Sequence, residues 1–241
     1  LVNNLELSFT GSDQYLAELM QNARRAGASY VEFSYDDQAR SLTVLDDGHG
    51  VQDMQDLLNV AFSGWEDEIQ QSETPYGIGF LSAIFQADYI TVESNGKKVE
   101  IDKRKALDFE KIEVTRGSIE TGTVVRLEGN FENPEQPVRT YARGFSIPVY
   151  VNGDEMERPC ARDSLAFRET SFGWIHIAGV DGLDQPDLRK ASTNTTVFLQ
   201  DQSVLRVGRP FGPDSNVVHL DPKQFFGRIP DRDTLIEDSA T

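Results

Sequence analysis

The sequence predicts an α+β fold in which a mixed sheet with helices on one face is followed by a smaller, strand-rich domain. Three observations lead to this prediction. An amphipathic helical pattern covers residues 12–26, alternating strand-like runs recur between residues 30 and 127, and mostly strand-like runs follow a proline-containing break at residues 130–137. We therefore expect two domains, residues 1–130 and residues 131–241.

The first predicted element is a helix that follows N-cap candidates at residues 10–13 and ends before Gly27. Its apolar stripe consists of Tyr15, Leu16, Leu19, Met20 and Ala23. Glu18 and Asn22 stand four residues apart and share one helix face, with Ala26 one turn further on. A carboxylate that orders a water beside an amide oxygen that ligates Mg²⁺ suits phosphate-ester chemistry. Taken alone, the same pair also fits an ordinary solvated helix face.

Two strands at residues 30–35 and 41–45 are predicted to form a hairpin whose second strand leads into a loop at residues 46–50. The loop begins with two aspartates, and glycines follow at alternate positions, Gly48 and Gly50. Glycines allow such a loop to turn sharply and to bring its backbone close to a ligand. The loop is therefore a candidate binding segment.

A helix is predicted around residues 53–61, and a polar, acidic loop follows over residues 63–75. The length and composition of this loop are typical of a lid or binding loop. Gly77 and Gly79 then lead straight into an apolar helix that includes Phe80. Backbone N–H groups at a helix N-terminus favour an anion, although two glycines by themselves are a weak signal for a phosphate site.

The remaining elements are predicted mainly as strands. In the first domain these are residues 89–93, 98–101, 111–114 and 123–127. In the second domain a helix near residues 138–143 precedes strands at residues 147–151, 172–177, 195–199 and 203–207 and a short helix at residues 221–226. No chemistry is evident in the second domain.

Composition excludes several classes of function. The net charge of −17 disfavours a protein that coats nucleic acid by neutralising phosphates. The single cysteine, Cys160, rules out an intrachain disulfide, favours a reducing compartment and is interpreted as a small, partly buried side chain rather than a nucleophile. The sequence shows neither an apolar run of membrane-spanning length nor a secretory signal pattern, so we expect a cytoplasmic protein with no membrane partner.

Taken together, the motifs resemble the four boxes of the GHKL superfamily. These Bergerat-fold ATPases include type II topoisomerases, mismatch-repair ATPases, histidine kinases and the large heat-shock chaperone. Residues 18–23 resemble the N box, residues 45–50 the DxGxG box, residues 76–80 the second glycine box, and residues 122–123 the threonine that closes the site. The resemblance covers roughly residues 12–130, looks closest to the chaperone and its relatives, and implies a two-layer Bergerat α/β sandwich.

The resemblance implies a site for ATP or ADP with Mg²⁺ as the cofactor. Glu18 would be the catalytic group that polarises the attacking water, Asn22 would ligate Mg²⁺, and Asp46 would accept the adenine amino proton. The other implied nucleotide-binding residues are Ala26, Gly48, Gly50, Gly77, Gly79, Phe80 and Thr123.

The sequence departs from the family pattern in three places. Thr74 stands where the family often has the first glycine of the second box, and Arg25 stands where it usually has aspartate. No lysine or arginine occurs between Ser41 and Gly96, so positive charge at the γ-phosphate must come from Mg²⁺, Arg24, Arg25, the second domain or another chain. The candidates in the second domain are Arg189, Lys190, Arg206 and Arg209.

The first functional hypothesis is a slow Mg²⁺-dependent ATPase that uses lid closure as a conformational switch in a chaperone-like or remodelling role. The alternative is a switch or scaffold that binds nucleotide but hardly cleaves it. Histidine-kinase catalysis fits poorly because His49, His176 and His219 lie in no evident dimerisation helix. The resemblance also implies ATP-dependent homodimerisation. The protein client stays open, and so does the role of the second domain, which is either transducer-like or part of a longer chain.

Overall fold

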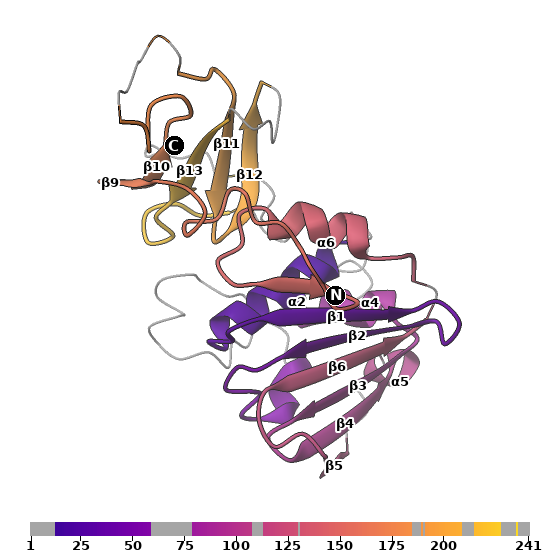
Figure 1. Cartoon of the computed structure of the whole chain (residues 1–241). Helices are drawn as coiled ribbons and strands as arrows, with labels where there is room; N and C mark the ends of the chain where they lie inside the picture. The colour runs from indigo at the N-terminus through magenta and orange to yellow at the C-terminus, as the bar shows by residue number, and fades with distance from the viewer. Residues whose placement is uncertain are drawn as a thin grey trace. The chain divides into compact units, whose positions relative to one another are not determined.

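The computed structural model describes residues 13–58, 79–107, 113–129, 131–184, 189, 191–208, 215–227 and 235. Within these residues the chain forms two compact units, and each contains its own sheet (Figure 1). The first sheet has eight strands and the second has five. The predicted α+β class, a mixed sheet followed by a strand-rich part, is confirmed.

The first part of the chain contains most of the helices. It begins with α2 (Gln14–Arg25), β1 (Val31–Asp36), β2 (Ser41–Asp46) and the 3-10 helix η1 (Met54–Leu58). It continues with α4 (Gly79–Gln86), β3 (Tyr89–Ser94), β4 (Lys97–Asp102), α5 (Lys103–Leu107), β5 (Val114–Arg116) and β6 (Thr123–Glu128). Then follow α6 (Glu135–Ala142), β7 (Val149–Val151) and β8 (Asp154–Glu155).

The eight strands are arranged in the order β5-β4-β3-β6-β2-β1-β7-β8. Every neighbouring pair is antiparallel except β1 and β7, which run parallel. Strand alternation places one row of apolar side chains across the sheet, because cross-strand partners point to the same face. This buried row contains Val92, Val125, Val44 and Phe33.

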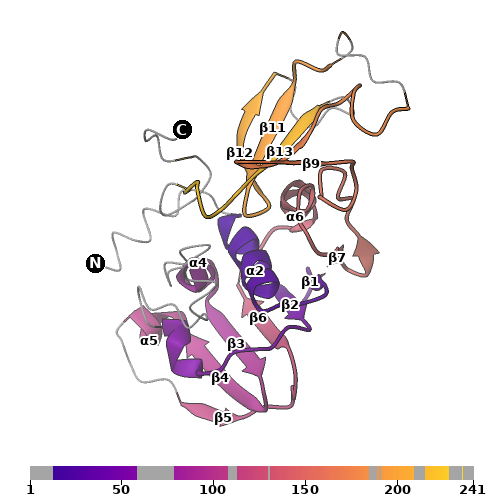
Figure 2. The same cartoon turned by 90° about the vertical axis from the view of Figure 1, so that its left-hand side faces the viewer.

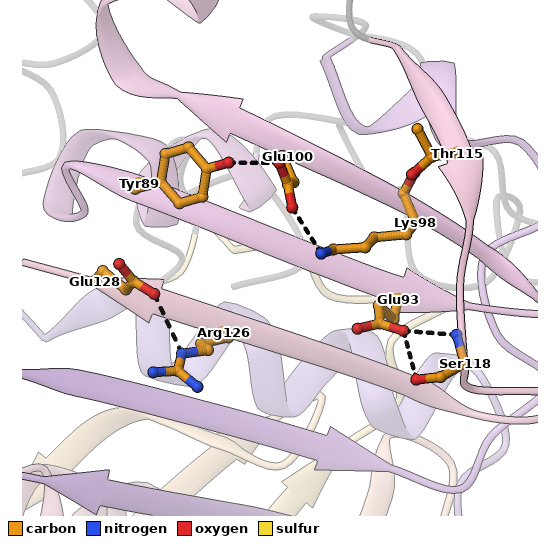
Figure 3. Close-up of polar contacts among 8 residues, drawn as sticks. All are labelled: Tyr89, Glu93, Lys98, Glu100, Thr115, Ser118, Arg126 and Glu128. Atoms are coloured by element: carbon orange, nitrogen blue, oxygen red, sulfur yellow. Dashed lines mark hydrogen bonds and ion pairs between the residues drawn. The ribbon is translucent and has the colours of Figure 1, made fainter. Parts of the chain in front are cut away.

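Helices α2 and α4 contact each other and lie together on one face of this sheet (Figure 2). The predicted apolar stripe of α2 is buried, as an amphipathic helix against a sheet requires. The opposite face of the sheet is polar, and Figure 3 shows polar contacts on it, some within one strand and some between neighbouring segments. On that face the Tyr89 hydroxyl donates to Glu100 at 2.8 Å, and the Lys98 ammonium lies 2.6 Å from the same carboxylate.

Several strand predictions are confirmed, but the sequence did not reveal where β7 pairs. It joins the first sheet through β1, and β8 follows it there, so residues 149–155 extend the first sheet. The division of the chain after residue 130 stays a prediction. The predicted strand at residues 111–114 is displaced to β5, and the predicted helix at 53–61 begins as η1, with residues 59–61 outside the described part.

The second unit is built on β9 (Arg168–Thr170), β10 (Gly173–His176), β11 (Thr195–Leu199), β12 (Gln202–Val207) and β13 (Asn216–Leu220). Their order is β12-β11-β13-β10-β9, and only β11 and β13 are parallel. Phe198, Val217 and Cys160 form one of its buried clusters. Burial raises the pKa of the Cys160 thiol, which fits the interpretation of an inert core side chain.

The short helix predicted at residues 221–226 is wrong, because this segment is a turn. The Asp221 carboxylate accepts the backbone N–H of Lys223 at 3.0 Å, and the Asp221 carbonyl accepts that of Gln224 at 3.0 Å. The Gln224 side chain donates to the same aspartate at 2.8 Å. These local bonds close a turn in place of a helix start.

Across the part of the chain that the structure describes, no helix has the length and apolar character needed to cross a membrane.

Candidate functional site

Three polar side chains lie in one row at an end of the buried face of the first sheet. Asp46 on β2 is the cross-strand partner of Thr123 on β6, and Thr123 is the partner of Ser94 on β3. Each lies two residues beyond a member of the buried apolar row, so all three point to the helix-covered face. Thr123 and Ser94 are buried, and Asp46 is partly buried. The sheet therefore presents a polar edge where its neighbouring rows are apolar.

Asp46 is the most strongly perturbed carboxylate of this edge. Burial raises its pKa to about 6, and the nearby charge of Asp47 acts in the same direction. Hydrogen bonds from the Gly48 amide, at 3.0 Å, and from the Thr123 hydroxyl oppose this rise, as does His49. Asp46 is therefore mostly ionised at neutral pH, and it is held by donors that leave a carboxylate acceptor at the end of the sheet.

The loop after Asp46 lies against the C-terminal end of α2. The backbone N–H of His49 donates to the Ala26 carbonyl at 2.9 Å. A Cβ atom on Gly48 would meet both the Cβ and the carbonyl oxygen of Ala26 at 2.7 Å. The Asp47 carboxylate also accepts the backbone N–H of Ser29 at 2.7 Å. A glycine at position 48 is thus required for this close approach of the loop to α2.

Two further glycines allow the loops around Asp46 to approach each other. Gly50 has a φ of +76°, and a Cβ there would lie 2.4 Å from the Ser94 hydroxyl oxygen. Gly122 has a φ of +77°, and a Cβ there would lie 2.2 Å from the Asp46 carbonyl oxygen. Both positions therefore exclude a side chain by backbone conformation and by space.

The helix that borders this loop, α2, carries the predicted catalytic residue Glu18 and the predicted Mg²⁺ ligand Asn22. Glu18 is buried, and its carboxylate makes no hydrogen bond or ion pair with the residues that the structure describes. Asn22 is partly buried, and its amide oxygen accepts a weak hydrogen bond from Arg25 at 3.5 Å. Arg25, which replaces the usual family aspartate, is itself buried. A cation is thus placed beside the predicted Mg²⁺ ligand.

The site thus combines a polar sheet edge, two close-packed glycine loops and a helix that carries Glu18 and Asn22. The sequence model of the histidine kinase-, DNA gyrase B- and HSP90-like ATPases matches residues 10–135. The chain belongs to this family of ATPases. Membership in this GHKL family supports nucleotide binding by the first unit, and the matched range contains every residue described above for the site.

The structure brings five of the predicted nucleotide-binding residues together at one end of the sheet, namely Ala26, Asp46, Gly48, Gly50 and Thr123. Gly79 and Phe80 begin α4, the helix that packs beside α2, as the glycine box predicted. Gly77, Thr74 and the predicted lid lie outside the described residues.

The candidate cations of the second part of the chain stay predictions. Lys190 and Arg209 lie outside the described residues, and Arg189 is exposed. Arg206 is also exposed, and its guanidinium donates to the Ser203 hydroxyl at 2.9 Å. These contacts assign none of the four to the GHKL site.

Sequence reasoning missed two residues that support the site, Ser94 and Asn95. The Asn95-Gly96 pair is by itself typical only of a tight two-residue turn between strands. A signal for Ser94 was present in the alternation of β3, since it follows the buried Ile90 and Val92 in the same register. A polar residue at a buried strand position indicates a specific hydrogen-bond requirement.

Within the described ranges no three His, Cys, Asp or Glu side chains lie close enough to form a metal site. Mg²⁺ bound with a nucleotide typically needs one or two protein ligands, because phosphate and water oxygens complete its octahedron. Asn22 is partly buried, and its amide oxygen is only weakly hydrogen bonded, which suits this limited role.

Proposed function

We propose that the first unit binds ATP with Mg²⁺ and hydrolyses it slowly. The observation that carries this proposal is the Asp46 carboxylate, which is partly buried at the end of a covered sheet and has a pKa raised to about 6. An ionised carboxylate in such a place attracts a hydrogen-bond donor, and the exocyclic amine of adenine provides one. The Thr123 hydroxyl, which donates to the same carboxylate, holds it in orientation.

The glycine loops suit a flat ligand packed closely against backbone. Gly48 and Gly50 carry no Cβ where one would collide with α2 or with Ser94. At the start of α4, the amides of Gly79 and Phe80 are available to phosphate oxygens, because the first N–H groups of a helix have no partner within it. In this proposal Gly77 contributes in the same way.

Glu18 is proposed as the group that orders and polarises the attacking water. It is buried and makes no polar contact with the described residues, so its carboxylate is available to a water. Asn22, four residues on and on the same face, would hold Mg²⁺ against the phosphates. Bound Mg²⁺ supplies positive charge that stabilises the transferred phosphoryl group.

One contact favours the second candidate function, a switch or scaffold that binds ATP but hardly cleaves it. Arg25 donates to the amide oxygen of Asn22, which is the atom proposed for Mg²⁺. If this contact persists with nucleotide bound, the metal loses a ligand and hydrolysis slows. If Arg25 turns toward the phosphates instead, it supplies the cation that residues 41–96 lack.

The wider biological role belongs to the same proposal. It comprises lid closure on ATP, ATP-dependent homodimerisation, and a chaperone-like or remodelling action on a protein client. We keep residues 1–130 as the ATP-binding domain and residues 131–241 as a second domain, either transducer-like or part of a longer chain. A cytoplasmic location fits the single cysteine, because reducing compartments disfavour disulfides.

Calorimetric titration of ATP and of ADP, each with Mg²⁺, tests the site directly. We expect saturable binding by the wild-type protein and a loss of affinity of about tenfold to a hundredfold in Asp46→Asn, as for a lost charge-assisted hydrogen bond. Asp154→Asn, which changes an exposed carboxylate on β8, is the control and should bind as the wild type does. No binding by the wild-type protein would overturn the proposal.

A further inference from the structure

The turn between β3 and β4 lies beside both loops of the nucleotide site. Asn95 and Gly96 form this turn with φ angles of +51° and +70°, the left-handed pair that a tight two-residue hairpin requires. The residue before the turn, Ser94, ends the polar row that contains Asp46 and Thr123. The turn is therefore adjacent to the site through the sheet itself.

One set of contacts joins this turn to the loop after Asp46. The Asn95 side-chain amide donates to the His49 carbonyl at 3.1 Å and to the Val51 carbonyl at 3.3 Å. The Ser94 hydroxyl accepts the Val51 N–H at 2.9 Å, and the Lys97 ammonium donates to the Gln52 carbonyl at 2.9 Å. Residues 49–52 are thus bound at four points by three side chains of one hairpin.

A second set of contacts joins the same turn to the segment that leads into β6. The Ser94 hydroxyl donates to the Gly122 carbonyl at 2.6 Å, and the Gly96 N–H donates to the Ile119 carbonyl at 2.7 Å. On the outer face of the sheet, the Glu93 carboxylate accepts both the N–H and the hydroxyl of Ser118 at 2.8 Å (Figure 3). The turn therefore also fixes the segment that precedes Thr123.

Ser94 couples the two loops through one atom. A serine hydroxyl has a single hydrogen, which is directed to Gly122, and its lone pair accepts the Val51 amide. The side chain is fully buried, so water cannot readily replace either bond. Gly50 packs directly over this oxygen.

We propose that Ser94 and Asn95 are positioning residues of the nucleotide site, which hold residues 49–51 and Gly122 in the arrangement that binds ATP. This inference rests on the proposed function, because it assigns a role toward the same ligand. Both residues act through the backbone of the loops beside Asp46 and Thr123.

A second Asn-Gly turn provides a matched control. Asn152 and Gly153 join β7 to β8 with φ angles of +51° and +85°. The Asn152 side chain also binds backbone, because its amide oxygen accepts the Tyr35 N–H at 2.8 Å. Tyr35 is near the end of β1 remote from Asp46, since Val31 is the partner of Asp46.

The experiment compares Asn95→Gly with Asn152→Gly. Glycine adopts a positive φ without strain, so each change removes a side-chain contact and keeps the turn. We expect Asn95→Gly to weaken ATP binding about tenfold and Asn152→Gly to change it less than about twofold, with similar losses of stability in urea. Ser94→Ala, which also releases Gly122, should weaken binding at least as much as Asn95→Gly.

Hydrogen exchange on the nucleotide-free protein gives a readout that does not depend on ATP. Amides of residues 49–52 should exchange faster in Asn95→Gly than in the wild type, and at the wild-type rate in Asn152→Gly. Unchanged exchange at these amides, or wild-type ATP affinity in Asn95→Gly and Ser94→Ala, would overturn the inference alone. No ATP binding by the wild-type protein would overturn the proposed function instead.

Discussion

Buried titratable side chains of the two units are bonded in different ways. In the second unit, the His219 ring donates to the Cys160 carbonyl at 2.8 Å, and the His176 ring donates to the Ala166 carbonyl at 2.9 Å. In the first unit, Asp46 is bonded by its own loop and by Thr123 but stands at the end of the sheet, and Glu18 has no polar contact among the described residues. The two histidines of the second unit are thus hydrogen bonded to its own backbone, whereas the two carboxylates of the first unit keep oxygens that can accept a hydrogen bond from a ligand or water.

The difference agrees with a structural role for the two histidines and with the ligand-binding role proposed for Asp46 and Glu18. His219 also stacks on Phe198 with ring centroids 4.9 Å apart, so its ring packs as a core aromatic side chain. A buried acceptor that is left without a donor is unfavourable unless a ligand or water supplies one. The family match to residues 10–135 covers the first set and not the second, which agrees with this division.

The largest effect expected from this comparison is on turnover. Glu18→Gln keeps the size of the side chain but removes the negative charge that polarises water, so phosphate release should fall at least about a hundredfold. ATP affinity should change less than about twofold, because the group acts on the attacking water and not on the nucleotide. Steady-state phosphate release and calorimetry measure the two quantities.

Glu32→Gln is the matched control for this experiment. Glu32 is a partly buried glutamate on β1, and its position alternates with those of the buried Val31 and Phe33, so it faces the other side of the sheet. It should retain wild-type turnover. Undiminished phosphate release by Glu18→Gln would show that Glu18 is not the group that activates water.

The parts of the site that the sequence could predict are those with local signals. Asp46 ends an alternating strand and precedes glycines, and Glu18 and Asn22 share a helix face, so each is recognisable within ten residues of sequence. Asn95 has only a local turn signal, while its amide binds carbonyls 44 and 46 residues earlier in the chain. Such a contact depends on sheet order, which periodicity does not determine.

The same limit explains what the sequence did not predict about the fold. The β7 strand has a clear strand pattern, but its parallel pairing with β1 connects segments more than a hundred residues apart. At residues 221–226, Asp221 followed by proline fits a helix start, yet side-chain bonds to Asp221 close a turn. Local propensity identified these segments as structured, and tertiary or side-chain contacts decided their form.

The next effect is a difference in the pH dependence of stability. Burial raises the folded-state pKa of Asp46 to about 6, so the native state binds this proton more tightly than the unfolded state does. The stability that Asp46 contributes to the folded state is fully present below about pH 4, the ordinary aspartate pKa, and is lost as pH rises to about 6. Burial lowers the pKa of His219, so its contribution is present above about pH 6.5 and is lost as pH falls below that value.

Urea unfolding of the nucleotide-free protein from pH 4 to pH 8 separates these two groups. Asp46→Asn should gain up to about 3 kcal/mol relative to wild type between pH 4 and pH 7, since it removes the titration. His219→Gln should be destabilised at neutral pH, and this loss should shrink toward acid. The same sign of pH dependence in both variants would contradict the contrast between the two sites.

The smallest effect concerns two buried threonines, one in each sheet. The Thr196 hydroxyl is fully buried and has no hydrogen-bond partner among the described residues, whereas the Thr123 hydroxyl donates to Asp46. Thr196→Val removes an unpaired hydroxyl from a strand that favours β-branched residues, and it should raise the free energy of unfolding by about 1 kcal/mol without changing ATP affinity.

Thr123→Val is the matched change in the first sheet, and it should weaken ATP binding about fivefold, because Asp46 loses the donor that orients its carboxylate. Urea unfolding and calorimetry on both variants complete the comparison. If Thr196→Val destabilises the protein, the Thr196 hydroxyl makes a hydrogen bond in solution and the prediction fails. If the two variants change ATP affinity equally, the polar row of the first sheet has no special relation to the ligand.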